Sequence, residues 1–237
     1  MTNSIETDDT LSFKEFFSLL WLNTQLLFKN SWEFFKVVFS YWGNSTFLKE
    51  DLSLTLMYLF HNPYSISKRF MRKRGEKYVH VYGETPLSTL DEIAKKANIK
   101  SSDTVFELGS GRGRACFWLN SFIGCKVVGL EFIPEFVERA KQIKDKLHIE
   151  GVEFRLQDFL QADLKEASVI YLYGSCLDDR DISILANKMA LLSSGTKVIT
   201  VSYPLADYCE KDAFVVMNLF TANFTWGKAE VFIQQVR

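Results

Sequence analysis

The sequence lacks the features that mark several common classes of protein. Its four Cys, at positions 116, 125, 176 and 209, form no Cys-x-x-Cys pair and match no zinc pattern, so we expect reduced thiols, no metal site and a cytoplasmic setting. The first ten residues are acidic where a signal peptide is basic, which argues against secretion. The longest uncharged run, 52–67, is shorter than the ~18 residues of a membrane-spanning helix. The net charge of −1 gives no general attraction to nucleic acid.

Aromatic residues, in contrast, are abundant: they make up 15% of the 237 residues and include 21 Phe. This composition is typical of a folded chain with a bulky core, and the length allows one large domain with a smaller appendage. Residues 1–79 are predicted to be an N-terminal α-helical region, with helices over 11–42, 47–61 and 64–75. Residues 80–237 form the second predicted domain.

Polar residues on the helix predicted for 11–42 follow one narrow stripe, formed by Lys14, Ser18, Gln25, Lys29, Lys36 and Ser40. A stripe this thin predicts that most of the helix circumference is covered. Two interpretations stay open. The helix packs onto the main domain, or the segment 11–61 makes a peripheral contact with a membrane surface or a partner protein.

The stretch KRFMRKRGEK at 68–77 holds six basic residues and one acidic residue. One interpretation is a solvated helix face beside a turn. The other is a patch that binds an acidic partner, a phosphate backbone or anionic lipid.

From residue 103 the sequence alternates between short strands and helices. The predicted strands are TVFELG, KVVGLE, VEFRLQ, SVIYLY and TKVITVS, and the helices are 112–122, 134–148 and 178–191. Such alternation predicts an α/β fold, in which a mostly parallel sheet carries helices on both faces. The last two predicted strands, AFVVMNLFTANF and TWGKAEVFIQQV, follow each other directly and predict an antiparallel strand pair at the end.

A glycine-rich loop follows the first predicted strand, in ELGSGRGRACFWL. Gly109, Gly111 and Gly113 lie between a strand end and a helix start, where glycine permits a sharp turn and a close approach of the backbone to a ligand. Glu131 ends the next strand, 22 residues after Gly109, where an acidic residue can bind both hydroxyls of a ribose. No Lys-Ser/Thr of a phosphate-binding loop follows, which disfavours nucleotide triphosphate hydrolysis.

This loop, the acidic residue two positions before it and the segment LQDFL together resemble the class I S-adenosylmethionine-dependent methyltransferases over about 80–237. The resemblance implies a seven-stranded, Rossmann-like sheet and the cofactor S-adenosyl-L-methionine, released as S-adenosyl-L-homocysteine. It implies that Glu107 holds the amino-acid end of the cofactor and that Asp158 and Phe159 flank the adenine. The cofactor-binding residues that we expect are Tyr82, Glu84, Thr85, Glu107, Gly109, Ser110, Gly111, Gly113, Arg114, Glu131, Phe132, Asp158, Phe159 and Tyr173.

The stretch VHVYGETPLSTL at 79–90 narrows the resemblance. Its Tyr-Gly-Glu-Thr segment resembles the one that closes over the methionine end of the cofactor in the non-SET histone-lysine methyltransferases of the disruptor of telomeric silencing type. The chain is also similar to the ATP-synthase c-subunit lysine methyltransferases, in which an apolar N-terminal segment precedes the same domain. Both resemblances imply a protein lysine as the acceptor. The histone enzymes carry Asn where this sequence has Tyr173.

The resemblance to lysine-modifying enzymes implies an aromatic channel for the acceptor amine, with the catalytic residues Tyr82, Tyr173, Tyr203 and Trp226. Glu84, with Thr85, is expected to contact the amino group of the cofactor. Thr85 is also expected to cap the helix that would begin at Pro86. Of the two Arg residues at the start of the loop helix, Arg114 is expected to contact the cofactor and Arg112 to face solvent.

Two alternatives to a lysine acceptor remain at this point. One is a small-molecule or nucleic-acid methyltransferase of the same fold. The fourth predicted strand is not followed by the Asn/Asp-Pro-Pro-Tyr/Phe pattern of amide and exocyclic-amine methylation. The other is a non-enzymatic interaction module that keeps the cofactor fold and uses the Phe-rich N-terminal helices.

Overall fold

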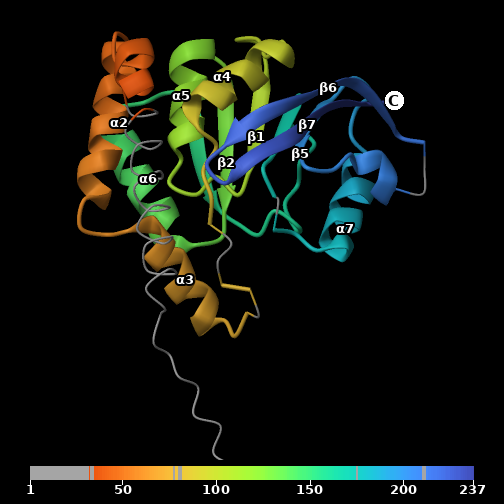
Figure 1. Cartoon of the computed structure of the whole chain (residues 1–237), viewed down its shortest axis with the longest axis horizontal. Coiled ribbons are helices and arrows are strands. Elements are labelled where there is room, and N and C mark those ends of the chain that lie inside the picture. Colours follow the sequence, from red (N-terminus) through yellow and green to blue (C-terminus); the bar gives the residue numbers. More distant parts are fainter. Residues whose placement is uncertain (1–31, 33–34, 77, 80–81, 175, 210–211) are drawn as a thin grey trace, which may run out of the picture.

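The computed structural model is built around a seven-stranded sheet with the strand order β3-β2-β1-β4-β5-β7-β6 (Figure 1). The structure describes residues 32, 35–76, 78–79, 82–174, 176–209 and 212–237. The pairs formed among β1 to β5 are parallel, and β7 is antiparallel to both β5 and β6. The predicted α/β class and the antiparallel pair at the end are therefore confirmed.

Strands at the centre of the sheet are buried along nearly their whole length, because helices or loops cover both of their faces. The strand bounds are β1 Thr104–Leu108, β2 Lys126–Glu131, β3 Val152–Leu156, β4 Val169–Leu172, β5 Lys197–Val201, β6 Phe214–Phe224 and β7 Gly227–Val236. All seven lie within the stretches that the β-branched runs predicted, shortened by a residue or two at some ends.

Helices divide between the two faces of the sheet and form two cores (Figure 1). The first face carries α4 Leu87–Lys96, α5 Arg114–Ile123 and α6 Pro134–Lys146. The second face carries α7 Asp179–Met189 and the short 3-10 helix Leu205–Tyr208. The glycine-rich loop between β1 and α5 therefore lies at the edge where the carboxyl ends of the parallel strands meet.

Two further helices, α2 Ser45–Tyr58 and α3 Pro63–Lys73, precede this domain. The predicted break between them is confirmed: the Asn62 side chain accepts a hydrogen bond from the N–H of Tyr64, and Pro63 begins α3. Phe47 and Leu54 of α2 belong to the same core as α5 and α6, so α2 is packed onto the domain that carries the sheet. The boundary between 79 and 80 stays a prediction.

Residues 35–41 form the described end of the first predicted helix, and the rest of that helix lies outside the described residues. Val37 and Tyr41 are buried, but Phe35 and Phe39 are 53% and 85% exposed. The prediction that most of the circumference is covered is therefore wrong for this part. The reason is geometric: among the described residues, the buried side chains of this segment lie on one face, where the Tyr41 ring packs against α5.

Among the described residues, none of the helices combines the length and the apolar character needed to cross a membrane. A contact of 11–61 with a membrane surface or a partner stays a prediction. The four Cys carry free thiols, as predicted, although only Cys116 and Cys125 are buried, whereas Cys176 is exposed and Cys209 is half-buried.

Candidate cofactor site

A pocket opens at the carboxyl ends of β1 and β4, where the order of the parallel strands reverses. Ligands of open α/β sheets bind at such switch points. The pocket is lined by Gly83, Glu84, Thr85, Glu107, Gly109, Ser110, Gly111, Arg114, Ala115 and Tyr173. Eight of these ten residues were among the expected cofactor-binding residues, and Gly83 and Ala115 were not.

The glycine-rich loop depends on glycine at two positions for different reasons. Gly111 has a φ of 53°, and a Cβ on it would lie 3.0 Å from the Tyr82 ring, so glycine lets Tyr82 cover the loop. Gly113 has a φ of 80°, and a Cβ there would lie 2.5 Å from the Phe154 ring. Gly113, which we expected to bind cofactor, lies outside the pocket lining and instead lets α5 approach β3.

Glu131 holds this loop against the end of β2. Its Oε2 accepts the N–H of Gly111 at 2.9 Å, and its Oε1 accepts the N–H groups of Phe132 and Ile133, each at 2.9 Å. Burial raises the pKa of the Glu131 carboxyl, and the three N–H groups oppose that shift. Contact between Glu131 and a ribose stays a prediction.

The floor of the pocket is acidic. Glu107 is 8% exposed and its Oε2 accepts a hydrogen bond from the Cys116 thiol at 2.9 Å. Burial raises the pKa of Glu107 to about 8; the Cys116 bond opposes the shift, and the charges of Glu84 and Glu131 add to it. Beside it, the buried Ser110 hydroxyl has no hydrogen-bond partner among the described residues. Acidic side chains, which a bound cation would favour in their ionised form, and an unsatisfied hydroxyl fit a cationic ligand that carries polar groups, and S-adenosylmethionine is such a ligand.

Arg112 does not face solvent, contrary to the prediction. Its Nε and Nη2 donate to the Glu84 carboxylate at 2.5 and 2.7 Å, and its side chain is 16% exposed. The loop turns back toward the segment around Tyr82, whose hydroxyl also donates to Glu84. Burial alone would raise the pKa of Glu84, but the Arg112 pair outweighs burial and lowers it. Glu84 is therefore ionised and fixed, and its contact with the cofactor amino group stays a prediction.

Thr85 does not cap the following helix, so that prediction is wrong. Helix α4 begins at Leu87, with Pro86 at the cap position and no side-chain cap bond. Thr85 Oγ1 instead shares a hydrogen bond of 2.5 Å with the hydroxyl of Tyr171, a buried residue of β4. The bond ties the segment around Glu84 to the strand beneath it.

Three stacked rings, Tyr173, Phe224 and Trp226, form what we call the aromatic wall. The Tyr173 and Phe224 rings lie 5.4 Å apart and the Phe224 and Trp226 rings 5.8 Å apart, with interplanar angles of 22° and 15°. Trp226 Nε1 donates to the Tyr173 hydroxyl at 2.5 Å, and Trp226 is 55% exposed. A Cβ on Gly83 would lie 2.9 Å from the Tyr173 ring, so glycine lets this wall reach the pocket. The wall runs from the pocket to the surface.

Asp158 and Phe159 stand beside the pocket without lining it. Phe159 lies 3.9 Å from the place that a Cβ on Gly109 would occupy, so the ring borders the glycine-rich loop. Asp158 is exposed, and its Oδ1 accepts the N–H of Leu160 at 2.9 Å. Their contact with adenine stays a prediction.

Two other predicted residues lie away from the pocket. Tyr203 belongs to the core on the α7 side of the sheet, and its hydroxyl donates to the Gly174 carbonyl at 3.3 Å. The Phe132 ring packs against Phe70 of α3 at 5.4 Å. The structure therefore brings Tyr82, Tyr173 and Trp226 near the pocket but does not bring Tyr203 to it.

Arg114 lines the pocket, and its partner was missed by the sequence analysis. Its guanidinium pairs with Asp51 of α2, 63 residues away. A pair so distant in sequence leaves no local signal. Tyr171 was missed for the same reason, since its partner Thr85 lies 86 residues away. Cys116 was missed although Glu107 is near in sequence, because a lone Cys carries no signal of the side chain that it contacts.

The fold and the site together define a class I S-adenosylmethionine-dependent methyltransferase, with S-adenosylmethionine as its cofactor. Residues 99–221 match the model of the methyltransferase domain family, and the chain belongs to this family.

Three known proteins show how wide that family is. The chain is 25% identical over 136 residues to a histone-lysine N-methyltransferase, H3 lysine-79 specific, of Dictyostelium discoideum, a match that covers 51% of this chain and 7% of that protein. It is 31% identical over 83 residues to an arsenite methyltransferase of Halobacterium salinarum, covering 34% and 21% of the two chains. The structure of an RNA methyltransferase from Salinibacter ruber in complex with S-adenosyl-L-homocysteine is similar with a TM-score of 0.53 and 25% identity, covering 65% of this chain and 93% of that chain. The chain thus spans a small part of both curated relatives.

Proposed function

We propose that this chain transfers the methyl group of S-adenosylmethionine to the side-chain amine of a protein lysine, in a histone or another protein. The observation that carries the proposal is the aromatic wall, which leads from the pocket to the surface. The wall offers an apolar surface along which a long aliphatic side chain that ends in an amine could reach the pocket. The similarity to the Dictyostelium histone-lysine enzyme over half of this chain supports the same acceptor.

The aromatic wall addresses the main chemical difficulty of this acceptor. A lysine amine attacks only when it is neutral, and removal from water lowers its pKa. The Tyr173 and Trp226 rings would exclude water along the path, and their faces would still attract an arriving or departing ammonium. S-adenosylmethionine, when bound, supplies a methyl carbon that its sulfonium already activates. The protein's contribution is then alignment and desolvation, which can account for a large part of a displacement barrier.

Labelling of a whole lysate tests this acceptor. Full-length protein is incubated with S-adenosylmethionine labelled in the methyl group and with lysate from its own source, and the lysate is then separated into protein, RNA, lipid and small molecules. We expect label in protein and, after hydrolysis, in methylated lysine. Label confined to RNA or to small molecules would contradict the lysine proposal while leaving the family and the cofactor intact.

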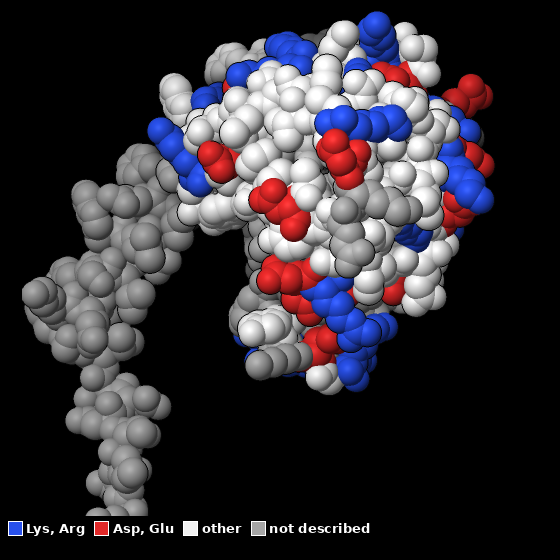
Figure 2. Space-filling view, turned by 90° about the vertical axis from the view of Figure 1, so that its right-hand side faces the viewer, with Lys and Arg blue, Asp and Glu red and all other residues white. Residues whose placement is uncertain are grey.

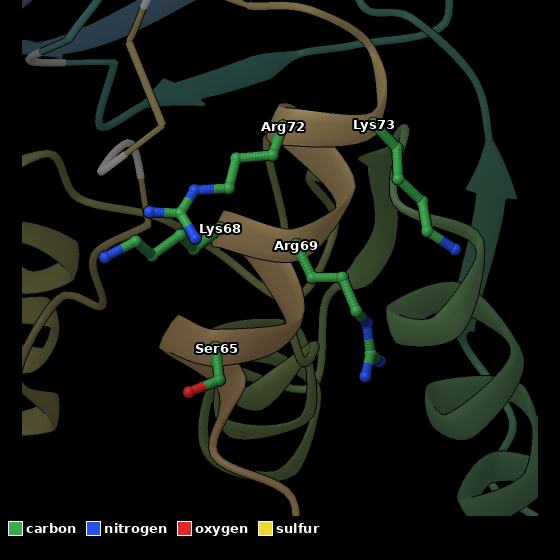
Figure 3. A pocket seen from close by; sticks show the side chains of 5 residues that line it. All are labelled: Ser65, Lys68, Arg69, Arg72 and Lys73. Carbon is green, nitrogen blue, oxygen red and sulfur yellow. The ribbon is translucent and has the colours of Figure 1, made fainter.

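A basic groove on α3 supports a preference for protein substrates with an acidic segment. It is lined by Ser65, Lys68, Arg69, Arg72 and Lys73, and Lys and Arg gather where α3 lies at the base of the molecule (Figures 2 and 3). Arg69 pairs with Glu135 at 3.0 Å, whereas among the described residues no carboxylate lies within ion-pair distance of Lys68, Arg72 or Lys73. In Figure 3, Lys68 and Arg72 extend to one side of the helix. Cations that have no carboxylate partner among the described residues suit an acidic ligand.

The start of α3 also contacts the segment that covers the glycine-rich loop. Tyr64, in the first turn of α3, packs edge-on against Tyr82 with ring centroids 5.1 Å apart. We therefore propose that an acidic segment beside the target lysine docks along α3. The apolar residues Ile66 and Met71 of this helix are buried rather than turned outward, so α3 itself lacks the apolar face of a helix that lies on a membrane.

Fluorescence anisotropy measures this docking without methyl transfer. The probe is a labelled peptide with one lysine flanked by Glu residues, compared with single-stranded RNA of equal charge. The double variant Lys68→Gln/Arg72→Gln is expected to bind the peptide about 5-fold more weakly at low salt, an effect that 0.5 M NaCl should erase. The matched control is Lys95→Gln/Lys96→Gln on α4, which should change binding less than about 2-fold. A larger effect on RNA than on peptide would overturn the acidic-peptide assignment.

A further inference from the structure

Asp51 is a buried carboxylate of α2 whose partner belongs to the cofactor pocket. Its side chain is 3% exposed. Oδ1 accepts from Arg114 Nε at 2.6 Å and Oδ2 accepts from Arg114 Nη2 at 3.0 Å. The indole N–H of Trp42 also donates to Oδ2, at 3.1 Å. A buried pair with two parallel bonds holds a guanidinium in one orientation.

Arg114 is, among the described residues that line the pocket, the one with a cationic side chain. Two other lining residues, Glu84 and Glu107, are acidic. The charge of Arg114 helps to lower the pKa of Glu84, so the two side chains are close enough to interact. Without Asp51, the guanidinium would have acidic partners inside the pocket, and pairing with them would block the space a ligand needs. The pair with Asp51 holds the Arg114 guanidinium at the side of the pocket and leaves the pocket interior open.

We infer that Asp51 is a positioning residue that directs Arg114 toward the carboxylate of the cofactor's amino-acid end. Arg carries five N–H donors, and the Asp51 pair uses two of them, so three remain for a second carboxylate. This assignment makes the N-terminal helical region part of the cofactor site. It rests on the proposed function only in that the cofactor must bind in this pocket.

Two ligands separate this role from a merely structural one. S-adenosylhomocysteine carries the amino-acid end, and 5′-methylthioadenosine has the same nucleoside and sulfur without it. By calorimetry, we expect Asp51→Asn to weaken S-adenosylhomocysteine at least ~10-fold, the size of one hydrogen bond to a charged group. Binding of 5′-methylthioadenosine should change less than about 2-fold.

Glu50→Gln provides the matched control. Glu50 is the neighbour of Asp51, is also buried, and accepts a hydrogen bond from Ser121 of α5 at 2.8 Å, away from the pocket. We expect this variant to bind both ligands within about 2-fold of wild type. If Asp51→Asn weakens both ligands equally, Asp51 only joins α2 to α5 and the inference is overturned. Tighter binding of S-adenosylhomocysteine would also overturn it, because Asp51 would then only neutralise Arg114.

Two more variants extend the test, and the first of them covers the case in which Asp51→Asn does not fold. Trp42→Phe removes one bond to Asp51 but keeps a ring, and it should weaken S-adenosylhomocysteine alone by about 2- to 3-fold. In the background of Arg114→Met, Asp51→Asn should have no further effect on the ratio of the two affinities, and an undiminished effect would contradict the inference. Wild-type protein that binds neither ligand overturns the cofactor assignment and this inference together, whereas equal losses overturn the inference alone.

Discussion

Replacing Glu107 with Gln is expected to stabilise the cofactor-free protein by up to ~4 kcal/mol at pH 7.5 and to weaken its binding of S-adenosylhomocysteine. Glu107 is buried beside other acidic side chains, and burial raises the pKa of its carboxyl to about 8. The amide has nearly the same shape and can still accept the bond from Cys116. It is neutral without a proton, so the cost of protonating Glu107 on folding disappears, together with the carboxylate that could attract the cationic end of the cofactor.

The direction in which burial shifts the Glu107 pKa determines how the stability of the protein changes with pH. Between the ordinary Glu pKa of 4.5 and about 8, the folded protein keeps a proton on Glu107 that the unfolded chain has lost. The free energy of unfolding therefore falls as the pH rises through this window, by up to ~1.4 kcal/mol per pH unit, and the contribution is constant above it. Glu107→Gln should remove that slope. Glu50, whose pKa burial raises to about 7, contributes a slope of the same sign in both proteins.

Urea unfolding at several pH values from 5 to 9 measures both quantities. The Glu107→Gln variant should be the more stable protein at pH 7.5, and the difference should shrink toward pH 5. The exposed residue Glu150 supplies the control, because Glu150→Gln at the surface should change the stability at pH 7.5 by less than about 0.5 kcal/mol. A destabilised Glu107→Gln variant at pH 7.5 would show that the Glu107 carboxylate is already compensated in the cofactor-free protein.

Glu131→Ala is expected to lower the affinity for S-adenosylhomocysteine by about 100-fold. The Glu131 carboxylate accepts three backbone N–H groups, one of them from Gly111 in the glycine-rich loop. Removing it leaves these donors without their acceptor and frees the loop. It also removes the carboxylate that the family resemblance assigns to the ribose, so the loss should exceed that of one hydrogen bond.

The sequence was sufficient to predict those elements whose structure depends on residues close together in the chain. The strands were predicted because each is a short β-branched run bounded by turns, and the loop because three glycines follow a strand end. Most of the pocket lining was predicted because it comes from short contiguous motifs, and parallel strands bring such motifs to one edge.

What the sequence did not predict depends on contacts between distant segments. Arg112 was expected in solvent, but Glu84 lies 28 residues away and the fold brings the two together. Thr85 satisfies the local pattern of a helix cap, yet the Tyr171 hydroxyl, 86 residues away, takes its hydrogen bond. The exposure of Phe39 has the same origin, because periodicity shows which residues share a face but not whether anything covers it.

The most direct test of the cofactor site is a calorimetric titration of S-adenosylhomocysteine into wild-type protein, Glu131→Ala and the control Glu150→Ala. We expect one molecule bound per chain by wild type and by Glu150→Ala with affinities within about 2-fold, and an affinity about 100-fold lower for Glu131→Ala. Circular dichroism before each titration confirms that the variants are folded. Binding by folded Glu131→Ala that equals wild type would contradict the assignment of the cofactor to this pocket.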